Sequence, residues 1–321
     1  MKHYHCGRNN LALTIQVPYD CPNNCPFCTA KEKYKNERPN FIRVKNVMET
    51  ILHGRFPIKD VVFSGGEPSA NINKLQELIN KVPSNKNVYI NTTLLSSTYE
   101  DFVNLVKKNP KIKGVNISRH ASSFEEETAL LHHIATDEQI SALARLISVR
   151  INVVLYQDID IEKIIARWNK YSGIEISFRE DYRKVTSEKE LCEENYFTAK
   201  LNSLFNYINH GGCNVCHTHQ YNLPSTEMTI RYHRGFEHTL IEHEDYFEYN
   251  DIIIEPNGEV LLDWEYKEEN IQHYRQAVKS LYYPNGKRFS IESKEVNNSS
   301  PGYFRHIDYE TAFPSCGISS C

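Results

Sequence analysis

The sequence lacks several features that would place the protein in a specialised class. None of its apolar runs is long enough to span a membrane. The opening segment, MKHYHCGRNN, has no apolar core of the kind found in secretory signals. The net charge is only −4, so we expect no general affinity for nucleic acid. Nine cysteines are an odd number, and their clustering is typical of metal ligands rather than disulfides. We therefore expect a cytoplasmic protein without a membrane partner.

The order of apolar and polar residues favours a parallel α/β fold in the first part of the chain. Between about residues 11 and 178, short apolar runs alternate with amphipathic helical stretches. The predicted strands are 11–17, 60–64, 87–91, 113–118, 150–155 and 173–178. The predicted helices are 44–53, 71–81, 98–108, 137–148 and 161–171, with Thr136 or Asp137 as the cap of the fourth helix. The alternation stops after residue 178, which indicates a different organisation in the rest of the chain.

Three cysteines stand within one short loop after the first predicted strand. The loop is residues 21–28, CPNNCPFC, and its thiols Cys21, Cys25 and Cys28 have the spacing C-x3-C-x2-C. Thiolates bind soft metals and iron–sulfur clusters, and a four-iron cluster usually takes four cysteine ligands. Three cysteines therefore leave one iron for a ligand that is not protein. The alternatives are a zinc knuckle, although zinc sites generally need four ligands, or thiols that bind no metal.

A Gly-Gly-Glu sequence follows the second predicted strand. Gly65 and Gly66 would let the backbone approach a ligand closely, and the Glu67 carboxylate can accept a hydrogen bond from an ammonium group. Alone, this triplet could be no more than a turn. Its place one strand after the cysteine loop makes a joint ligand site the better interpretation.

The cysteine spacing, the aromatic Phe27 before the last cysteine and the Gly-Gly-Glu sequence together resemble the radical S-adenosylmethionine (SAM) enzymes. This resemblance implies a [4Fe-4S] cluster on Cys21, Cys25 and Cys28, with SAM bound to the open iron. It also implies reductive cleavage of SAM to methionine and a 5′-deoxyadenosyl radical, which abstracts a hydrogen atom from the substrate. In such enzymes the Gly-Gly-Glu motif holds the amino group of SAM, and Phe27 would lie on the adenine side. A flavodoxin or ferredoxin would supply the electron.

The resemblance also implies a fold. Six β/α units fit the partial (β/α)6 TIM-like barrel of that family, because a full eight-unit barrel would need more chain. We expect this barrel to span residues 1–185. Residues 186–321 would then form a C-terminal α+β extension that covers the barrel mouth.

Polar residues at three further strand ends are candidate ligand contacts, because α/β barrels place such residues at the mouth. The family uses these positions for the carboxylate and ribose of SAM, and here they are Thr92, Ser118 and Asn152. The third strand departs from the commoner Thr-Asn-Gly of the family. Arg119 and His120 could bind a substrate carboxylate or phosphate, and the alternative is an ordinary salt bridge and a solvated imidazole.

The C-terminal part holds a second candidate metal site. Cys213 and Cys216 form a C-x2-C pair after a Gly-Gly turn, which is typical of half a metal site. The other half could be Cys316 and Cys321 near the end of the chain. Further candidates for that half are Cys192, His217 and His219. Such a site would hold a second iron–sulfur cluster or zinc, and the alternative is thiols that bind nothing. A predicted hairpin at 252–262, with its turn at Asn257-Gly258, resembles one found in family extensions.

These features together predict a radical SAM enzyme that modifies a small molecule, either a nucleotide or an amino-acid-like compound. A peptide-modifying member of the family is the first alternative, although such enzymes usually carry more cysteines in their extensions. A non-catalytic iron–sulfur or zinc protein that binds a partner is the second. The Gly-Gly-Glu sequence argues against that class, because a structural cluster needs no ammonium acceptor.

Overall fold

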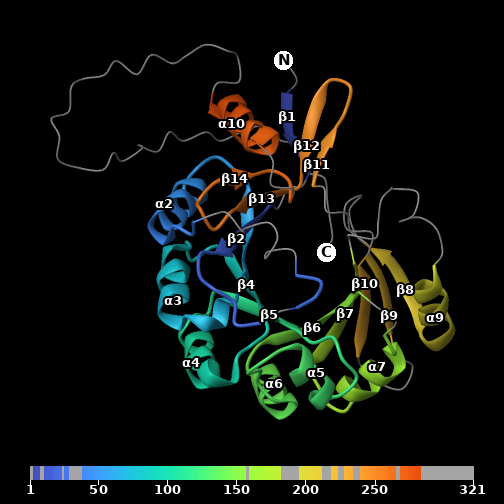
Figure 1. The fold of residues 1–321 in the computed structure, drawn as a ribbon. Helices are drawn as coiled ribbons and strands as arrows, with labels where there is room; N and C mark the ends of the chain where they lie inside the picture. The colour runs from blue at the N-terminus through green and yellow to red at the C-terminus, as the bar shows by residue number, and fades with distance from the viewer. Residues whose placement is uncertain are drawn as a thin grey trace, which may run out of the picture.

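The computed structural model describes residues 3–7, 11–23, 25–28, 38–156, 159–181, 195–211, 218–222, 228–233, 239–264 and 268–282. Its main feature is a curved sheet of 11 strands with helices along its convex side (Figure 1). The predicted strands are all found, as β2 (Leu11–Val17), β3 (Ile58–Gly65), β4 (Asn87–Thr92), β5 (Ile112–Ser118), β6 (Ser148–Leu155) and β7 (Ile174–Glu180). They lie side by side in chain order and run parallel. The predicted partial barrel is confirmed.

Strands from the C-terminal part extend this sheet at both sides. The parallel partner of β2 is β13 (Asp251–Ile254), and that of β7 is β10 (Thr229–His233). Beyond them lie β14 (Val260–Leu261) on one side and β9 (Thr218–Asn222) and β8 (Asn206–Gly211) on the other. Among the described strands, β14 and β8 form the two edges, so the sheet does not close. The predicted domain boundary at 185/186 stays a prediction, and strands from both sides of it share one sheet.

Apolar side chains on the convex face of the sheet form the core against the helices. The helices are α2 (Phe41–Leu52), α3 (Ile72–Lys81), α4 (Tyr99–Lys108), α5 (Phe124–Leu130), α6 (Asp137–Ala144) and α7 (Ile161–Asn169). Ile15, Phe63 and Ile90 lie in one row across β2, β3 and β4, and all three are fully buried. Burial of each such side chain contributes about 1.5–3 kcal/mol to the stability of the folded protein. This apolar layer holds the strands so that their carboxyl ends meet at one rim.

The helices differ from the predictions mainly at their ends. The fourth predicted helix ends at Ala144 rather than Ser148, because Ser148 already begins β6. Its predicted cap Thr136 is confirmed as part of a capping box. Helix α5 was not predicted, and it is a short segment whose Ser123 side chain caps the Glu126 amide. The predicted hairpin is confirmed, since β13 and β14 pair in antiparallel and Gly258 has a φ of 83° in the turn.

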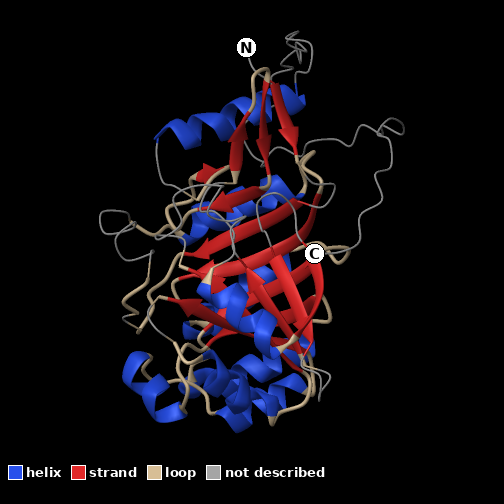
Figure 2. Cartoon of the chain, turned by 90° about the vertical axis from the view of Figure 1, so that its right-hand side faces the viewer, coloured by secondary structure: helices blue, strands red, loops and turns tan. Residues whose placement is uncertain are grey.

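A second, three-stranded sheet stands apart from the large one (Figure 2). It consists of β1 (His3–Cys6), β12 (Tyr246–Tyr249) and β11 (Leu240–Glu242), and α10 (Glu268–Tyr282) lies beside it. A further α-helix, α9 (Tyr196–Leu204), leads into β8, and two short 3-10 helices, η1 (Pro68–Ala70) and η2 (Ser96–Thr98), follow β3 and β4. Among the described residues, no helix is both long enough and apolar enough to cross a membrane.

Candidate functional site

The cysteine loop lies just beyond the carboxyl end of β2. The thiols of Cys21, Cys25 and Cys28 are all partly exposed. The loop turns between the last two, where the Cys28 amide donates to the Cys25 carbonyl at 3.1 Å. In the described residues, no three Cys, His, Asp or Glu side chains are arranged to hold a single metal ion. The prediction of a cluster at this loop therefore rests on the spacing of its three cysteines and on its position after β2.

Phe27 anchors the far end of this loop against the ends of β5 and β6. Its ring meets the His120 ring edge-on, with 4.5 Å between centroids. The Tyr156 ring lies 4.6 Å from it on a tilt. The aromatic residue of the motif thus fixes the loop to the barrel rim.

The Gly-Gly-Glu turn packs directly against the start of the cysteine loop. Gly65 has a φ of 99°, and a Cβ there would lie 2.7 Å from the Gln16 side-chain oxygen. A Cβ on Gly66 would overlap the Tyr19 carbonyl oxygen. The Tyr19 hydroxyl donates to the Pro68 carbonyl at 3.0 Å. Both glycines are therefore required by the contact between the loops that follow β2 and β3, besides any contact with a ligand.

Glu67 points into the protein and is 1% exposed. One carboxylate oxygen accepts from the Ser69 amide at 2.8 Å and from the Thr92 hydroxyl. The other accepts from the Thr93 amide at 2.7 Å and the Thr93 hydroxyl at 2.6 Å. A carboxylate has about four acceptor positions, so protein donors occupy this one fully. The predicted contact of Glu67 with an ammonium group stays a prediction, and it requires one of these donors to be displaced.

The concave face of the sheet, below the cysteine loop, is polar. Ser118 on β5 and Asn152 on β6 are paired in register on this face. Asn116 donates to Asn91 at 2.8 Å, which extends the polar row toward β4. The Asn152 side-chain oxygen is buried and has no hydrogen-bond partner among the described residues. A buried unpaired polar atom costs about 1–3 kcal/mol, so this acceptor is free to take a hydrogen bond from water or from a bound molecule.

Charged side chains continue this row on β6, β7 and β10. Arg150 donates to one oxygen of Glu175 at 3.2 and 3.3 Å. The Arg231 guanidinium lies 3.6 Å from the same oxygen. All three side chains are partly exposed, at 25–34%. This group was not predicted from the sequence, although the alternation of its residues with buried apolar residues along β6 and β7 was a usable signal.

Arg119 lies inside the protein rather than at its surface. Its guanidinium donates to the carbonyl of Thr93 at 2.6 Å, of Ser118 at 2.7 Å and of Ala135 at 2.9 Å. Burial lowers its pKa to about 10. The negative charge of Glu127 opposes this lowering, and the positive charge of Arg167 adds to it. It is still protonated at neutral pH. In this position Arg119 connects the loops after β4 and β5, and its predicted contact with substrate stays a prediction.

His120 is also buried, and its ring accepts a hydrogen bond from the Val154 amide at 3.1 Å. Burial lowers its pKa to about 3, and the charge of Arg119 acts in the same direction. The folded protein therefore keeps this imidazole neutral, whereas the unfolded chain protonates it near pH 6.5. Because only the unfolded state takes up the proton, stability is lost as the pH falls from about 6.5 toward 3.

This shift predicts a measurable pH dependence of unfolding. Between pH 6.5 and 5, proton uptake by His120 in the unfolded chain should lower the free energy of unfolding of the wild type by about 1.6 kcal/mol. His120→Asn keeps an acceptor for the Val154 amide and removes the titrating group. Between the same two pH values, the free energy of unfolding of this variant should therefore fall by less than that of the wild type, and the difference should equal the contribution of His120. Urea unfolding of both metal-free proteins at the two pH values measures the difference. Equal losses in the two proteins would contradict a neutral, buried His120.

A buried group of ion pairs stabilises the segment that follows β5. Arg167 on α7 pairs with Asp137 at 2.7 Å and with Glu127 at 3.1 Å. Glu127 in turn accepts from the amides of His120 and Ala121 at 2.8–3.0 Å. The segment that carries Arg119 and His120 is thereby tied to α7.

Comparison with known proteins agrees with this arrangement. Residues 15–159 match the family model described as "Radical SAM superfamily". The matched part includes the cysteine loop, the Gly-Gly-Glu turn and the strand ends from β2 to β6. Residues 15–159 therefore form a radical SAM domain. No curated protein sequence matches the chain.

Solved structures of radical SAM proteins are similar in fold. The crystal structure of Streptococcus suis SuiB has a TM-score of 0.54 and 14% identity, over 85% of this chain and 65% of that chain. The structure of SuiB bound to its precursor peptide SuiA has a TM-score of 0.52 and 16% identity, over 79% and 59%. A structure of anSMEcpe with bound AdoMet and a peptide has a TM-score of only 0.39 and 16% identity, over 53% of this chain and 51% of that chain. The chain thus spans about three fifths of the length of SuiB, and the likeness concerns the fold.

The residues of the radical SAM domain fit the cofactors that its family implies. Three partly exposed thiols stand at the carboxyl ends of the parallel strands. The unpaired Asn152 oxygen and the Ser118 side chain lie on the concave face next to that rim. Thr92 is instead buried and donates to Glu67. The structure therefore leaves Ser118 and Asn152 better placed than Thr92 to contact a ligand directly.

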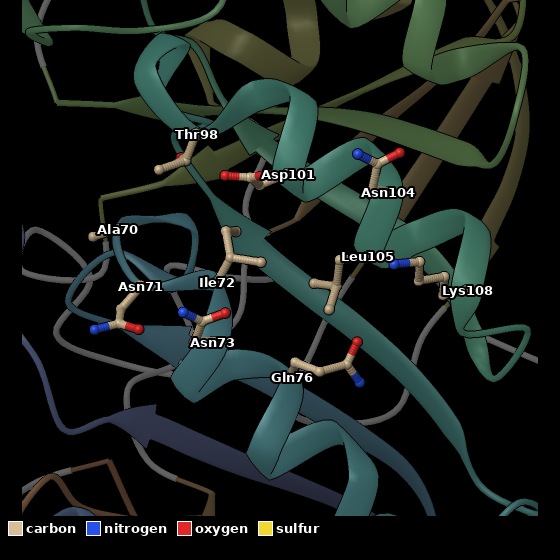
Figure 3. Close-up of a pocket in the computed structure, with 10 residues that line it drawn as sticks. All are labelled: Ala70, Asn71, Ile72, Asn73, Gln76, Thr98, Asp101, Asn104, Leu105 and Lys108. Carbon is tan, nitrogen blue, oxygen red and sulfur yellow. The ribbon is translucent and has the colours of Figure 1, made fainter.

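Two features remain, namely the second predicted metal site and a groove on the outer layer of the domain. Cys213, Cys216, Cys316 and Cys321 lie outside the described residues, so the second metal site stays a prediction. Figure 3 shows a groove of about 560 Å³ between α3 and α4 on the outer layer of the radical SAM domain. Its lining is mostly polar and includes Asn73, Gln76, Asp101, Asn104 and Lys108. It contains none of the predicted site residues.

Proposed function

We propose that the protein is a radical SAM enzyme whose [4Fe-4S] cluster is held by Cys21, Cys25 and Cys28. The observation that carries this proposal is the contact between two loops. The cysteine loop and the Gly-Gly-Glu turn follow adjacent parallel strands and interlock at Gly66 and Tyr19. Bound to Cys21, Cys25 and Cys28, a reduced cluster would supply the electron for reductive cleavage of SAM to methionine and a 5′-deoxyadenosyl radical, the species that would take a hydrogen atom from the substrate.

In this proposal the polypeptide binds and orients the reactants. The backbone of Gly65 and Gly66 would face the amino group of SAM, and Ser118 and Asn152 would face its ribose and carboxylate side. Support comes from the shared concave face of Ser118 and Asn152 and from the unpaired Asn152 oxygen. Phe27 would lie between this region and the rim, where it already packs on His120.

The charged row on β6, β7 and β10 supports a small substrate with ionic groups. Arg150 and Arg231 share one carboxylate oxygen of Glu175, so two guanidinium groups face a single counter-charge. A phosphate or carboxylate can accept from such guanidinium groups, and Glu175 can accept from an ammonium group. A nucleotide or an amino-acid-like compound meets these requirements.

A peptide substrate is the second candidate, favoured by one observation. SuiB, which has a similar fold, is known as a complex with a precursor peptide. An amino-acid side chain within a peptide could enter the same concave face, with the main chain outside the rim. The ionic row would then recognise a charged side chain of that peptide.

Cleavage of SAM tests the proposed function directly. The protein, reconstituted with iron and sulfide without oxygen and reduced with dithionite or with a flavodoxin and its reductase, should form 5′-deoxyadenosine from SAM. A sample without the reductant is the matched control. If reduced, iron-loaded protein forms no 5′-deoxyadenosine, the assignment fails and a binding protein with a structural cluster becomes the better interpretation.

A further inference from the structure

One side chain anchors the middle of the cysteine loop to the rest of the domain. Asn23 lies between Cys21 and Cys25 and is the single buried residue among those that the structure describes in this loop, at 2% exposed. Its amide nitrogen donates to the Thr93 hydroxyl at 2.9 Å, and its oxygen accepts from the His132 amide at 2.9 Å. The loop is thereby tied to segments 70 and 109 residues away.

Thr93 continues this connection to the Gly-Gly-Glu turn. Its hydroxyl has only one proton, and it donates that proton to the Glu67 carboxylate at 2.6 Å while it accepts from Asn23. The orientation of the hydroxyl is therefore fixed. The Thr93 amide donates to the same Glu67 oxygen at 2.7 Å.

Glu67 ends the series of hydrogen bonds and is itself immobilised. Its remaining oxygen accepts from the Ser69 amide and the Thr92 hydroxyl. Hydrogen bonds to an ionised carboxylate are shorter and stronger than neutral ones, and a satisfied buried network favours a single arrangement. An apolar residue in place of Asn23 would fill the same space but hold no particular register between the loops.

We infer that Asn23, Thr93 and Glu67 form a positioning network that sets the place of the cysteine loop relative to the Gly-Gly-Glu turn. This inference depends on the proposed function, in which the first segment holds the cluster and the second holds SAM. None of the three residues needs to touch either cofactor for the effect. Their role is to fix the distance over which the electron reaches the bond that breaks, and a misplacement of about 1 Å can lower a rate 100-fold.

Two substitutions of Thr93 separate this role from a general contribution to folding. Thr93→Val removes the hydroxyl and keeps the shape, whereas Thr93→Ser keeps the hydroxyl. Asn23→Ala removes the other partner. The matched control is Asn109→Ala, because Asn109 is also buried and donates to the Leu105 carbonyl and to Gln76, on the outer helices.

The measurements are iron content, affinity for SAM and the rate of 5′-deoxyadenosine formation per cluster at saturating SAM. We expect Thr93→Val and Asn23→Ala to keep their iron and to lose about 10–100-fold in this rate. Thr93→Ser and Asn109→Ala should stay within about threefold of the wild type. Electron paramagnetic resonance of the reduced cluster should show a weaker response to SAM in the two impaired variants.

The possible failures are distinguishable. If the wild type cleaves SAM and Thr93→Val cleaves it equally fast per cluster, the network has no positioning role. The same conclusion follows if Asn109→Ala loses as much rate as Thr93→Val, because the effect would then be general destabilisation. If the wild type does not cleave SAM, the proposed function is wrong and this inference is overturned with it.

Discussion

The variant with Cys21, Cys25 and Cys28 all replaced by alanine should hold about four fewer iron atoms per chain than the wild type and should form no 5′-deoxyadenosine. The physical reason is that thiolates are the protein ligands of such clusters. These three thiols are partly exposed and belong to one loop at the rim. Reconstitution without oxygen, followed by iron analysis and product detection, measures both quantities.

Cys6→Ala is the matched control for this experiment. Cys6 is likewise partly exposed but lies on β1 in the small sheet. Its replacement should leave the iron content and SAM cleavage unchanged. Iron that remains in the triple variant would have to be held by other residues, such as the cysteines after residue 186. Persistent reductive cleavage of SAM by the triple variant would show that the cluster is elsewhere.

Arg167→Met should lower the free energy of unfolding by about 3–5 kcal/mol, because it leaves two carboxylates buried without their cation. The Arg167 side chain is only 4% exposed, and those of Glu127 and Asp137 are 0% and 9% exposed. Arg167 also donates to the carbonyls of Ala121 and Ser123. Such a loss is a large fraction of the total stability of about 5–15 kcal/mol.

Lys81→Met provides the comparison for Arg167. Lys81 pairs with Glu49 at 3.2 Å on the surface, with side chains 38% and 41% exposed. An exposed pair of this kind contributes about 0–1 kcal/mol. Urea unfolding of the metal-free proteins should therefore show a clear difference between the two variants. Similar small losses in both would mean that Glu127 and Asp137 find other partners or take up protons.

The sequence was sufficient for the features that depend on neighbouring residues. Strands β2 to β7 follow from short apolar runs, and their helices follow from the period of the apolar residues between them. The cysteine loop and the Gly-Gly-Glu turn are local motifs, so their places after β2 and β3 followed as well. The requirement for Gly66 was attributed to a ligand, whereas the structure adds a contact with the Tyr19 carbonyl.

Features that depend on distant residues were not predictable in this way. Asn23 has no local signal, because its partners Thr93 and His132 lie far along the chain. The position of Arg119 at a strand end was predicted, but a position at the rim does not fix the direction of the side chain. Its guanidinium turns inward to three carbonyls. The pairing of β10 with β7 and of β13 with β2, the outer strands of the six that were predicted, was missed for the same reason.

The pairing of β13 with β2 affects how the protein is made. Asp251 lies opposite Ala12, so the partner of one of the first strands is synthesised about 240 residues later. Because the ribosome adds about 5–20 residues per second, the edge of β2 stays unpaired for roughly 12–48 seconds before β13 is synthesised. An apolar strand with an open edge pairs readily with other chains during such a delay. The yield of folded protein in a cell should therefore depend on translation speed and on chaperones that shield this edge.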